Sequence, residues 1–217
     1  MARLTLDISM SLDGFVAGPN PSLEDPLGIG GEQLHEWAVR TKTFRDFHGQ
    51  EGGGDVDSDD ELLAESVGSI GAIVMGRRMF SGGAGPWEDD PNASGWWGDD
   101  PPFHKPVFVV THHEREPLVL ADTTFTFVTD GVESAVEQAR SAAGEKKAGI
   151  AGGGAVIQQA LDAGLLDELQ LHVAPLLLGD GVRLFDANDG RTRRLEQTSL
   201  RESPTGVVHM TFRVDPS

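Results

Sequence analysis

The chain has 217 residues, and with 38% hydrophobic and 24% charged residues it can bury a core. Asp and Glu number 35 against 17 Lys and Arg, a formal net charge of −18. Nucleic acid and anionic membrane surfaces both require a basic face, so this balance argues against either as the main partner. The absence of cysteine excludes disulfides, thiolate zinc sites and cysteine nucleophiles. Asp7 and Asp13 interrupt the amino terminus where a signal peptide needs an unbroken apolar stretch. No apolar run is long enough to span a membrane, so we expect a soluble, cytoplasmic protein.

The first half of the chain mixes strand and helix patterns. Apolar and polar residues alternate over residues 3–10, which is typical of a strand with one buried face. Helical spacing predicts a helix over residues 31–47, and the capping-box spacing of Ser58 and Glu61 predicts the start of another. Loops are expected at 49–60 and 81–105, and short apolar strands at 72–75 and 107–110.

The second half continues the alternation of strands and helices. A strand over 167–178 is interrupted by Pro175, and residues 194–201 and 206–214 read as an antiparallel pair. The other expected elements are strands at 123–129 and 148–151, a helix capped by Asp130 and a helix over 155–161. This order predicts a single three-layer α/β/α domain over residues 1–217, with a mostly parallel sheet and an antiparallel C-terminal edge.

Three glycines separate a predicted strand from a predicted helix. Gly152, Gly153 and Gly154 allow a close backbone approach, and the start of the next helix offers unpaired N–H groups. The pattern favours an anion-binding turn over a turn with no ligand. It is not the dinucleotide fingerprint G-x-G-x-x-G, because Ile157 stands where the last glycine would be.

Two further strand ends carry groups suited to phosphate. Gly76 is followed by Arg77 and Arg78, and arginine forks match phosphate oxygens. Ion pairs with the abundant surface carboxylates are the alternative for these arginines. Thr111 and His112 end a third strand. The adjacent His113 does not make a metal pair, because neighbours on a strand point to opposite faces, and we expect no metal. Ligands bind beyond the carboxyl ends of strands in open α/β sheets, so one elongated phosphate-bearing ligand would explain all three ends.

In this order, the motifs resemble the dihydrofolate-reductase-like fold, most closely the reductase domain of the riboflavin-biosynthesis deaminase–reductase and its stand-alone relatives. The resemblance covers nearly the whole chain. The residues that carry it are Met10-Ser11-Leu12-Asp13-Gly14, Met75-Gly76-Arg77-Arg78, Val110-Thr111-His112, Gly152-Gly153-Gly154 and Asp167-Glu168-Leu169 through Leu178-Gly179-Asp180-Gly181.

The resemblance implies an NADPH-dependent oxidoreductase. It places Gly152, Gly153, Gly154, Ala155 and Val156 at the cofactor pyrophosphate and Gly76, Arg77, Arg78, Thr111 and His112 around the adenosine 2′-phosphate. It places the backbone near Ser9, Val16 and Ala17 at the nicotinamide. Met79 departs from the threonine that dihydrofolate reductases usually have at this point, which removes a hydroxyl from the pyrophosphate contacts.

The substrate end is predicted from the same resemblance. Asp13 is expected to donate the proton that accompanies hydride transfer, with an Asx-type turn as the structural alternative. Leu34 and Trp37 are expected to contact the substrate, while Glu32 and Glu36 are expected on the solvated face of their helix. Deamination is excluded, because the deaminase half of such enzymes needs a zinc site with two cysteines.

Three functions remain open from the sequence. The first is a riboflavin-biosynthesis-like reductase acting on an aminouracil ribosyl-phosphate or a similar small substrate. The second is dihydrofolate reduction. The third is an NADP(H)-binding protein without turnover. The resemblance also implies a homodimer formed through the carboxyl-terminal part of the sheet, where Leu169, Leu171 and Val173 offer apolar surface.

Overall fold

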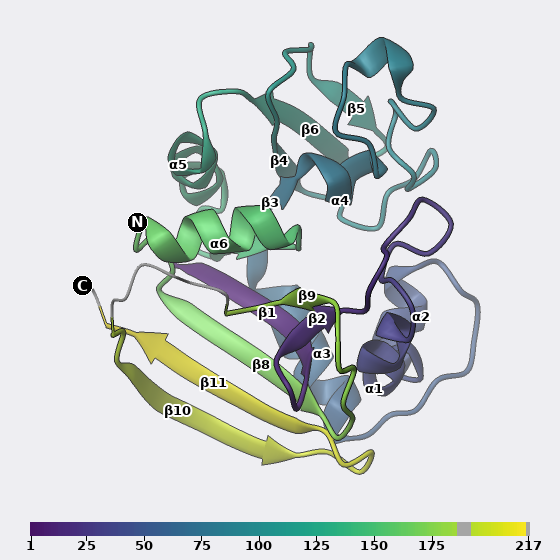
Figure 1. Cartoon of the computed structure of the whole chain (residues 1–217), viewed down its shortest axis with the longest axis vertical. Coiled ribbons are helices and arrows are strands. Elements are labelled where there is room, and N and C mark those ends of the chain that lie inside the picture. The colour runs from purple at the N-terminus through teal and green to yellow at the C-terminus, as the bar shows by residue number, and fades with distance from the viewer. Residues whose placement is uncertain (186–191, 216–217) are drawn as a thin grey trace. The chain divides into compact units, whose positions relative to one another are not determined.

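The computed structural model describes residues 1–185 and 192–215 (Figure 1). The chain packs as two compact units, each assembled from separate segments. The first unit combines Met1–Leu6 with Ile70–Leu166, and the second combines Asp7–Ser69 with Asp167–Ser217. Strand β1 (Leu4–Ser11) contributes its first residues to one unit and its last residues to the other. The expectation of one domain over residues 1–217 stays a prediction.

The first unit is built on a mostly parallel sheet. Its strands follow the order β1-β7-β3-β4-β6-β5, and all neighbours are parallel except β5 and β6. The strands other than β1 are β3 (Ile70–Gly76), β4 (Pro106–Val110), β5 (Leu118–Leu120), β6 (Thr123–Val128) and β7 (Lys147–Ile150). Its helices are α4 (Arg77–Ser81), η2 (Trp87–Asp89), α5 (Val132–Ala142) and α6 (Gly154–Asp162).

Burial explains why β3 and β4 are apolar without alternation. Helix α5 packs on β3, β4 and β7, and α6 packs on β3, so these central strands lie against helices rather than water. A strand covered on both faces needs no polar side, which is the pattern of parallel sheets. The fully buried side chains of this core include Leu4, Leu6, Val74, Met75, Phe80, Val107, Val109, Phe125 and Val136.

The tryptophan-containing segment 81–105 packs onto the first unit. The indole Nε1 of Trp96 donates to the backbone oxygen of Met79 at 2.9 Å, and Trp87 Nε1 donates to the His113 oxygen at 2.8 Å. Trp97 stacks edge-on against Phe103 at 4.8 Å between ring centroids. These contacts fix a segment that sequence patterns present only as a long loop.

The second unit contains an antiparallel set of strands at its carboxyl-terminal end. Its strand order is β10-β11-β8-β1, and β10, β11 and β8 are antiparallel neighbours, as expected. Its strands other than β1 are β2 (Phe15–Ala17), β8 (Glu168–Ala174), β9 (Val182–Arg183), β10 (Leu195–Glu202) and β11 (Val208–Val214), with β2 and β9 forming a separate two-stranded ribbon. Figure 1 shows β8, β11 and β10 side by side in that order. Strand β8 ends before Pro175, where the predicted interruption falls.

The predicted helix over residues 31–47 is three short pieces. They are η1 (Gly31–His35), α1 (Glu36–Val39) and α2 (Lys42–Phe47). Thr41 breaks the run, because its backbone is extended and its hydroxyl donates to the Ala38 oxygen at 2.7 Å. The same hydroxyl accepts the Phe44 N–H and caps α2. A threonine at a helix start competes for backbone groups in this way, and the apolar spacing alone does not reveal it.

Two predicted helix caps are wrong. Helix α3 (Ser58–Ser69) begins where expected, but its cap is the Asp57 carboxylate, which accepts the N–H groups of Asp59 and Asp60 at 3.0 and 3.2 Å. Ser58 lies inside the helix instead. Helix α5 is preceded by Gly131 without any side-chain cap, so Asp130 does not cap it. Asp and Ser are equally good N-caps, so capping by Asp57 instead of Ser58 leaves the start of α3 where the sequence predicts it.

The core of the second unit gathers around one tryptophan. Leu34, Trp37, Ala38, Leu62, Ala174 and Val207 form this buried cluster. The chain as a whole is a mixed α/β protein with a large, mostly parallel sheet flanked by helices, and the predicted fold class is confirmed. Within the described residues, no helix is both long enough and apolar enough to cross a membrane.

Candidate active site

Three parallel strands bring the predicted phosphate-binding residues of the first unit to one edge. Strands β7, β3 and β4 are neighbours, and Val74 pairs with Ile150 on one side and Phe108 on the other. Their carboxyl ends lead into Gly152, Gly76 and Thr111 respectively. The structure therefore brings together three motifs that are far apart in the sequence.

A close backbone approach explains the glycines at this edge. Gly152 and Gly153 have φ angles of 123° and 93°, a region that side-chain-bearing residues rarely adopt. A Cβ on Gly153 would lie 3.3 Å from both the Cα and the N of Gly76. A Cβ on Gly76 would in turn meet the Val156 side chain at 3.2 Å. Close packing at this edge thus favours glycine at positions 76 and 153.

The amino terminus of α6 has donors available for an anion. Gly153 precedes the helix, and no side chain caps it. The N–H groups of Val156 and Ile157 bond to the Gly153 oxygen at 2.9 and 3.1 Å, while Gly154 and Ala155 lie exposed before them. The first N–H groups of a helix lack intrahelical partners and carry the positive end of the helix dipole. These residues fit a pyrophosphate.

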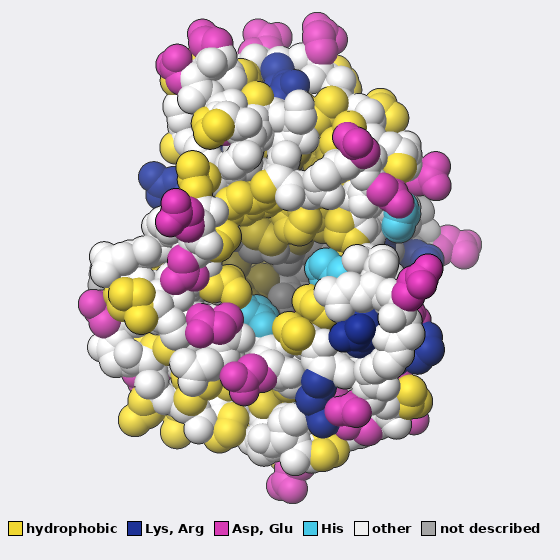
Figure 2. All heavy atoms as spheres, turned by 90° about the vertical axis from the view of Figure 1, so that its right-hand side faces the viewer, with side chains coloured by type: hydrophobic (Ala, Val, Ile, Leu, Met, Phe, Trp, Pro, Cys, Tyr) yellow, Lys and Arg dark blue, Asp and Glu magenta, His cyan; other side chains and the backbone are white. Residues whose placement is uncertain are grey.

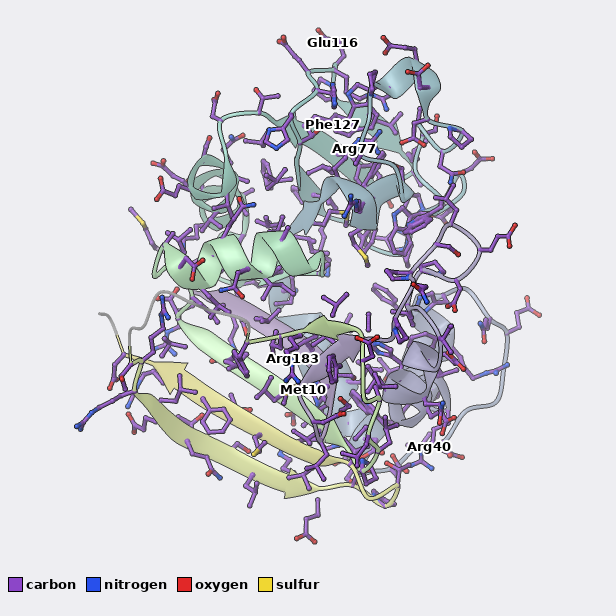
Figure 3. The ribbon with its side chains drawn as sticks, in the orientation of Figure 1. Met10, Arg40, Arg77, Glu116, Phe127 and Arg183 are labelled. Carbon is purple, nitrogen blue, oxygen red and sulfur yellow. The ribbon has the colours of Figure 1, made fainter. Side chains whose placement is uncertain are left out.

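Arg77 is engaged inside the first unit. Its Nη2 lies 2.5 Å from Asp90 Oδ2, its Nη1 donates to Ser81 Oγ, and its guanidinium stacks 3.6 Å from the Trp87 ring centroid (Figure 3). The side chain is 7% exposed. Burial raises the pKa of Asp90, but hydrogen bonds from Ser81 and Arg77 and the charge of Arg77 outweigh it, so that pKa lies below its usual value. This guanidinium is therefore committed to an internal ion pair.

Two other predicted phosphate-binding residues, Arg78 and His112, remain accessible to a ligand. Arg78 is exposed at the start of α4, and His112 is exposed after β4. Thr111 is buried, and its hydroxyl accepts the His113 N–H at 3.1 Å. Of the two predicted arginines, the geometry favours Arg78 as the cation for a phosphate.

The Asp13 carboxylate is held by hydrogen bonds within the second unit. Its carboxylate accepts the Ser11 hydroxyl at 2.6 Å and the backbone N–H groups of Leu178 and Gly179 at 3.2 and 2.8 Å. The hydrogen bond from Ser11 lowers the pKa of Asp13 the most, desolvation opposes it, and the two backbone N–H groups lower that pKa further. A carboxylate in this state holds no proton to donate at neutral pH. The geometry gives the predicted proton donor no support.

The remaining predicted residues of the second unit divide between core and turn. Leu34 and Trp37 are 0% and 3% exposed, so they are core residues rather than a surface for substrate. Trp37 Nε1 donates to the buried Ser9 hydroxyl at 2.9 Å, which ties the nicotinamide-binding segment predicted at Ser9 to this core. Val16 and Ala17 are half-buried in β2. Glu32 and Glu36 are exposed, as predicted.

Sequence reasoning missed a buried polar cluster next to Trp37. His172 on β8 and His209 on β11 are direct cross-strand partners, and their Nδ1 atoms lie 2.7 Å apart. Asp7 and Asp59 hydrogen-bond to the outer nitrogens of this pair. The available signal was one histidine in each of two predicted strands, 167–178 and 206–214.

A cation beside the Asp13 turn was also missed. Arg183 on β9, labelled in Figure 3, donates from Nη1 to the Asp13 backbone oxygen at 3.2 Å and lies 4.4 Å from the Phe15 ring centroid. Its side chain is exposed. It is a basic group in an acidic chain, and Figure 2 shows acidic side chains scattered over the face in view with few basic ones among them.

The described residues contain no group of three or more histidines or carboxylates arranged to hold a metal ion.

Known proteins resemble this chain over nearly its whole length. Residues 2–209 match the family model described as the RibD C-terminal domain. The chain is 26% identical to the uncharacterized protein YyaP of Bacillus subtilis (strain 168), over 97% of this chain and 94% of that protein. Among solved structures it resembles a candidate riboflavin biosynthesis protein of Shewanella sp. PV-4, with a TM-score of 0.64, 24% identity and 99% of each chain covered.

Two more distant structures share the fold. A diaminohydroxyphosphoribosylaminopyrimidine deaminase/5-amino-6-(5-phosphoribosylamino)uracil reductase of Thermotoga maritima aligns with a TM-score of 0.59 at 13% identity, over 99% of this chain and 57% of that one. A dihydrofolate reductase of Enterococcus faecalis complexed with NADP(H) aligns with a TM-score of 0.53 at 14% identity, over 98% of this chain and 96% of that one.

Proposed function

Because the chain belongs to the RibD C-terminal domain family, we propose that it is an NADPH-dependent reductase that transfers a hydride to a small heterocyclic or ribosylamino substrate. Membership in this reductase family implies an oxidoreductase. The cofactor and the substrate class are the parts that we propose. A compound of the 5-amino-6-(5-phosphoribosylamino)uracil type is the first substrate to test, since a structural relative is named for that reaction.

The observation that carries the cofactor proposal is the glycine cradle at the start of α6. Gly76 and Gly153 leave a space that a Cβ would fill, and the uncapped helix terminus beside them supplies N–H donors. Backbone donors of this kind bind a pyrophosphate without basic side chains. Arg78 would receive the 2′-phosphate, since its side chain is exposed and Arg77 is committed to Asp90.

Each part of the chain then has a defined task. The bound cofactor supplies the hydride, and the protein orients it and excludes water. The N–H groups of Gly154 and Ala155 hold the pyrophosphate, while the segment around Ser9, Val16 and Ala17 holds the nicotinamide. Ser9 is fixed for this task by the hydrogen bond from Trp37.

Dihydrofolate reduction is the weaker candidate. The acidic groups on the segment that carries Leu34 and Trp37 are Glu32 and Glu36, and both are exposed. A pterin-binding acid on that segment would have to be buried against the ring. The similarity to the Enterococcus enzyme, at 14% identity, shows the fold alone.

Two measurements on the purified protein test the proposal. Fluorescence titration with NADPH and with NADH should give the tighter complex with NADPH. Absorbance at 340 nm should then fall when the aminouracil ribosyl-phosphate is added, and should stay constant with dihydrofolate. Absence of binding by either cofactor would contradict the proposal, whereas NADPH binding without turnover on either substrate would favour a non-catalytic NADP(H)-binding protein.

A further inference from the structure

A continuous chain of hydrogen bonds crosses the second unit from one surface position to another. It begins at the exposed Thr205, in the turn between β10 and β11, and ends at Asp7 on β1, whose side chain is 29% exposed. Five hydrogen bonds connect its six members in a fixed order. The members are Thr205, Ser203, Asp59, His209, His172 and Asp7.

The outer part of the chain has one donor direction. Ser203 Oγ donates to Asp59 Oδ2 at 2.6 Å, which uses its only proton. The contact between the Ser203 and Thr205 hydroxyls therefore has Thr205 as the donor. Asp59 lies in the first turn of α3 and is fully buried. Thr205 thus connects the buried Asp59 carboxylate to solvent through the Ser203 hydroxyl.

The inner part is the histidine pair. His209 Nε2 lies 3.3 Å from Asp59 Oδ1, and His172 Nε2 lies 2.6 Å from Asp7 Oδ1. Because each Nε2 atom faces a carboxylate, Asp59 for His209 and Asp7 for His172, both Nε2 atoms act as donors. The two Nδ1 atoms are 2.7 Å apart and so must share one proton. The pair therefore holds exchangeable protons in a buried site.

The surroundings of the pair disfavour a positive charge on His209. Burial lowers the pKa of His209, and the neighbouring His172 lowers it further, against the raising effect of Asp59 and Asp7. His35 on η1 also feels His172 and lies beside it. On the other side, Arg40 (Figure 3) pairs with Asp57 and lies 3.4 Å from Asp59. A second proton on the pair would have no acceptor between the rings.

Asp7 can pass a proton on. Its carboxylate accepts from His172 and from the Ser66 hydroxyl, and two of its four lone-pair positions remain available. Burial raises the pKa of Asp7, but the charge of His172 and hydrogen bonds from His172 and Ser66 outweigh it. Asp7 is ionised at rest, and the proton waits on the imidazole behind it. Asp13, by contrast, is held by backbone N–H groups and has no such reservoir.

We propose that this chain is a proton wire that delivers, through Asp7, the proton that accompanies hydride transfer. The inference rests on the proposed reductase function. Reduction of a C=N bond places a hydride, with its electron pair, on carbon and moves the π electrons to nitrogen, which takes up one proton. The hydride comes from the reduced nicotinamide. A proton passes from His172 Nε2 to Asp7 and on to the nitrogen, and the pair is refilled from solvent through Asp59, Ser203 and Thr205.

The wire assigns separate roles to its members. Asp7 is the catalytic residue that touches the substrate, and His172 and His209 are positioning and relay residues behind it. Trp37 packs on both rings, with centroids 4.4 and 4.8 Å away, and keeps water from the pair. Exclusion of water from the histidine pair prevents the proton from passing to solvent before it reaches Asp7.

Two variants test the wire in the full-length protein. His209→Gln keeps a hydrogen-bonding side chain but cannot relay a proton, and Ser203→Ala cuts the link to Thr205. Thr198→Val is the matched control, since its hydroxyl bonds to the Thr211 oxygen on the same hairpin outside the wire. General acids contribute about 10²- to 10⁴-fold, so kcat with the aminouracil ribosyl-phosphate should fall at least about tenfold in His209→Gln. Affinity for NADPH should stay within about threefold.

Isotope effects separate a relay from a structural role. In His209→Gln the solvent deuterium isotope effect on kcat should rise, and the effect of deuterium at the transferred position of NADPH should fall, because the proton step becomes limiting. Thr198→Val should change neither. A His209→Gln protein that is folded by circular dichroism and keeps its kcat and both isotope effects would overturn the proposal.

Nuclear magnetic resonance gives a readout that does not depend on turnover. The resting protein should show one strongly downfield proton coupled to the Nδ1 nitrogens of both histidines, and His209→Gln should lack it. If the wild-type protein shows no such proton, the wire is overturned whatever the activity. If the proton is present but NADPH does not bind, the proposed function fails, and with it the use of the wire in reduction.

Discussion

Arg77 and Asp90 form an ion pair in which both side chains are almost entirely buried, 7% and 2% exposed, with 2.5 Å between Nη2 and Oδ2. Sequence reasoning treated Arg77 as a receptor for a ligand phosphate. The ion pair instead anchors the segment after α4 to the first unit, and Trp87 covers it.

The first prediction concerns this ion pair. Arg77→Ala leaves the Asp90 carboxylate buried without its cation, which costs about 3–5 kcal/mol when one partner of a buried pair is removed. Urea unfolding of the variant should show a loss of that size. Arg3→Ala, at an exposed position of the same unit, is the control and should lose less than about 0.5 kcal/mol. A loss below 1 kcal/mol, roughly that of an exposed pair, would contradict the buried role.

The second prediction assigns the cofactor preference to Arg78. A charge-assisted contact to phosphate contributes roughly 1.5–3 kcal/mol, so Arg78→Ala should weaken NADPH binding about 10- to 150-fold and leave NADH binding nearly unchanged. Fluorescence titration with both cofactors measures this difference. Arg3→Ala again serves as the control. Equal weakening of both cofactors would remove Arg78 from the 2′-phosphate site.

The third prediction concerns the glycine cradle. Gly153→Ala puts a Cβ 3.3 Å from the Gly76 backbone and forces alanine into a φ of 93°. Strain of this kind costs about 1–3 kcal/mol. We expect NADPH and NADH binding to weaken together by at least about tenfold, because the pyrophosphate is common to both. Gly85→Ala, where a Cβ would meet nothing within 4 Å, should bind both cofactors normally.

The fourth prediction follows from the buried histidine. Burial and His172 lower the pKa of His209 in the folded state, so the unfolded chain binds more protons below its ordinary value of 6.5. Stability is therefore full above that pH and falls as the pH drops through it. Asp7, whose pKa is also lowered, adds a second loss below its ordinary value of 3.8. Unfolding free energies measured between about pH 8 and 4 should fall less steeply in His209→Gln than in the wild type. Identical slopes would show that His209 is not the group that titrates.

The fifth prediction is the homodimer. Leu169 and Leu171, expected to offer apolar surface for it, are core residues that are 1% and 5% exposed, so the exposed apolar edge is β10 instead. Strand β10 is an edge strand with Leu195 and Leu200 44% and 57% exposed, and unpaired edges with apolar side chains favour association. Light scattering should give twice the chain mass of 23.2 kDa. Leu200→Glu should return the protein to a single chain, while Val56→Glu, at a position 72% exposed outside β10, should remain dimeric. A wild-type mass of one chain at micromolar concentration would end this prediction.

Most elements were predictable because their patterns are local. The strands near 72–75, 107–110 and 123–129 and the β10–β11 pair follow from apolar periodicity. The break at Thr41 and the cap at Asp57 were not, because a side chain that bonds its own backbone leaves no periodic signal. Short strands such as β5 and β9 are similarly invisible, since two or three residues cannot show an alternation.

The site was predictable where it depends on the backbone and unpredictable where it depends on side-chain partners. Gly152 and Gly153 stand at the expected strand-to-helix turn. The partner of Arg77, however, lies 13 positions away in a segment without periodicity. The two histidines of the buried pair are separated by 37 positions, and only the register of β8 and β11 joins them.

Strand β1 has a consequence for how the chain is made. It is synthesised before all other strands of the first unit, and its partner residues on β7 are synthesised last among them: Leu4 pairs with Ala148 and Leu6 with Ile150. An apolar strand must therefore wait until β7 has been synthesised before its hydrogen bonds to β7 can form, and contacts of such long sequence separation slow folding. A fragment covering only residues 70–166 would present an open β7 edge, so expression of that fragment should yield aggregates unless residues 1–6 are joined back to it.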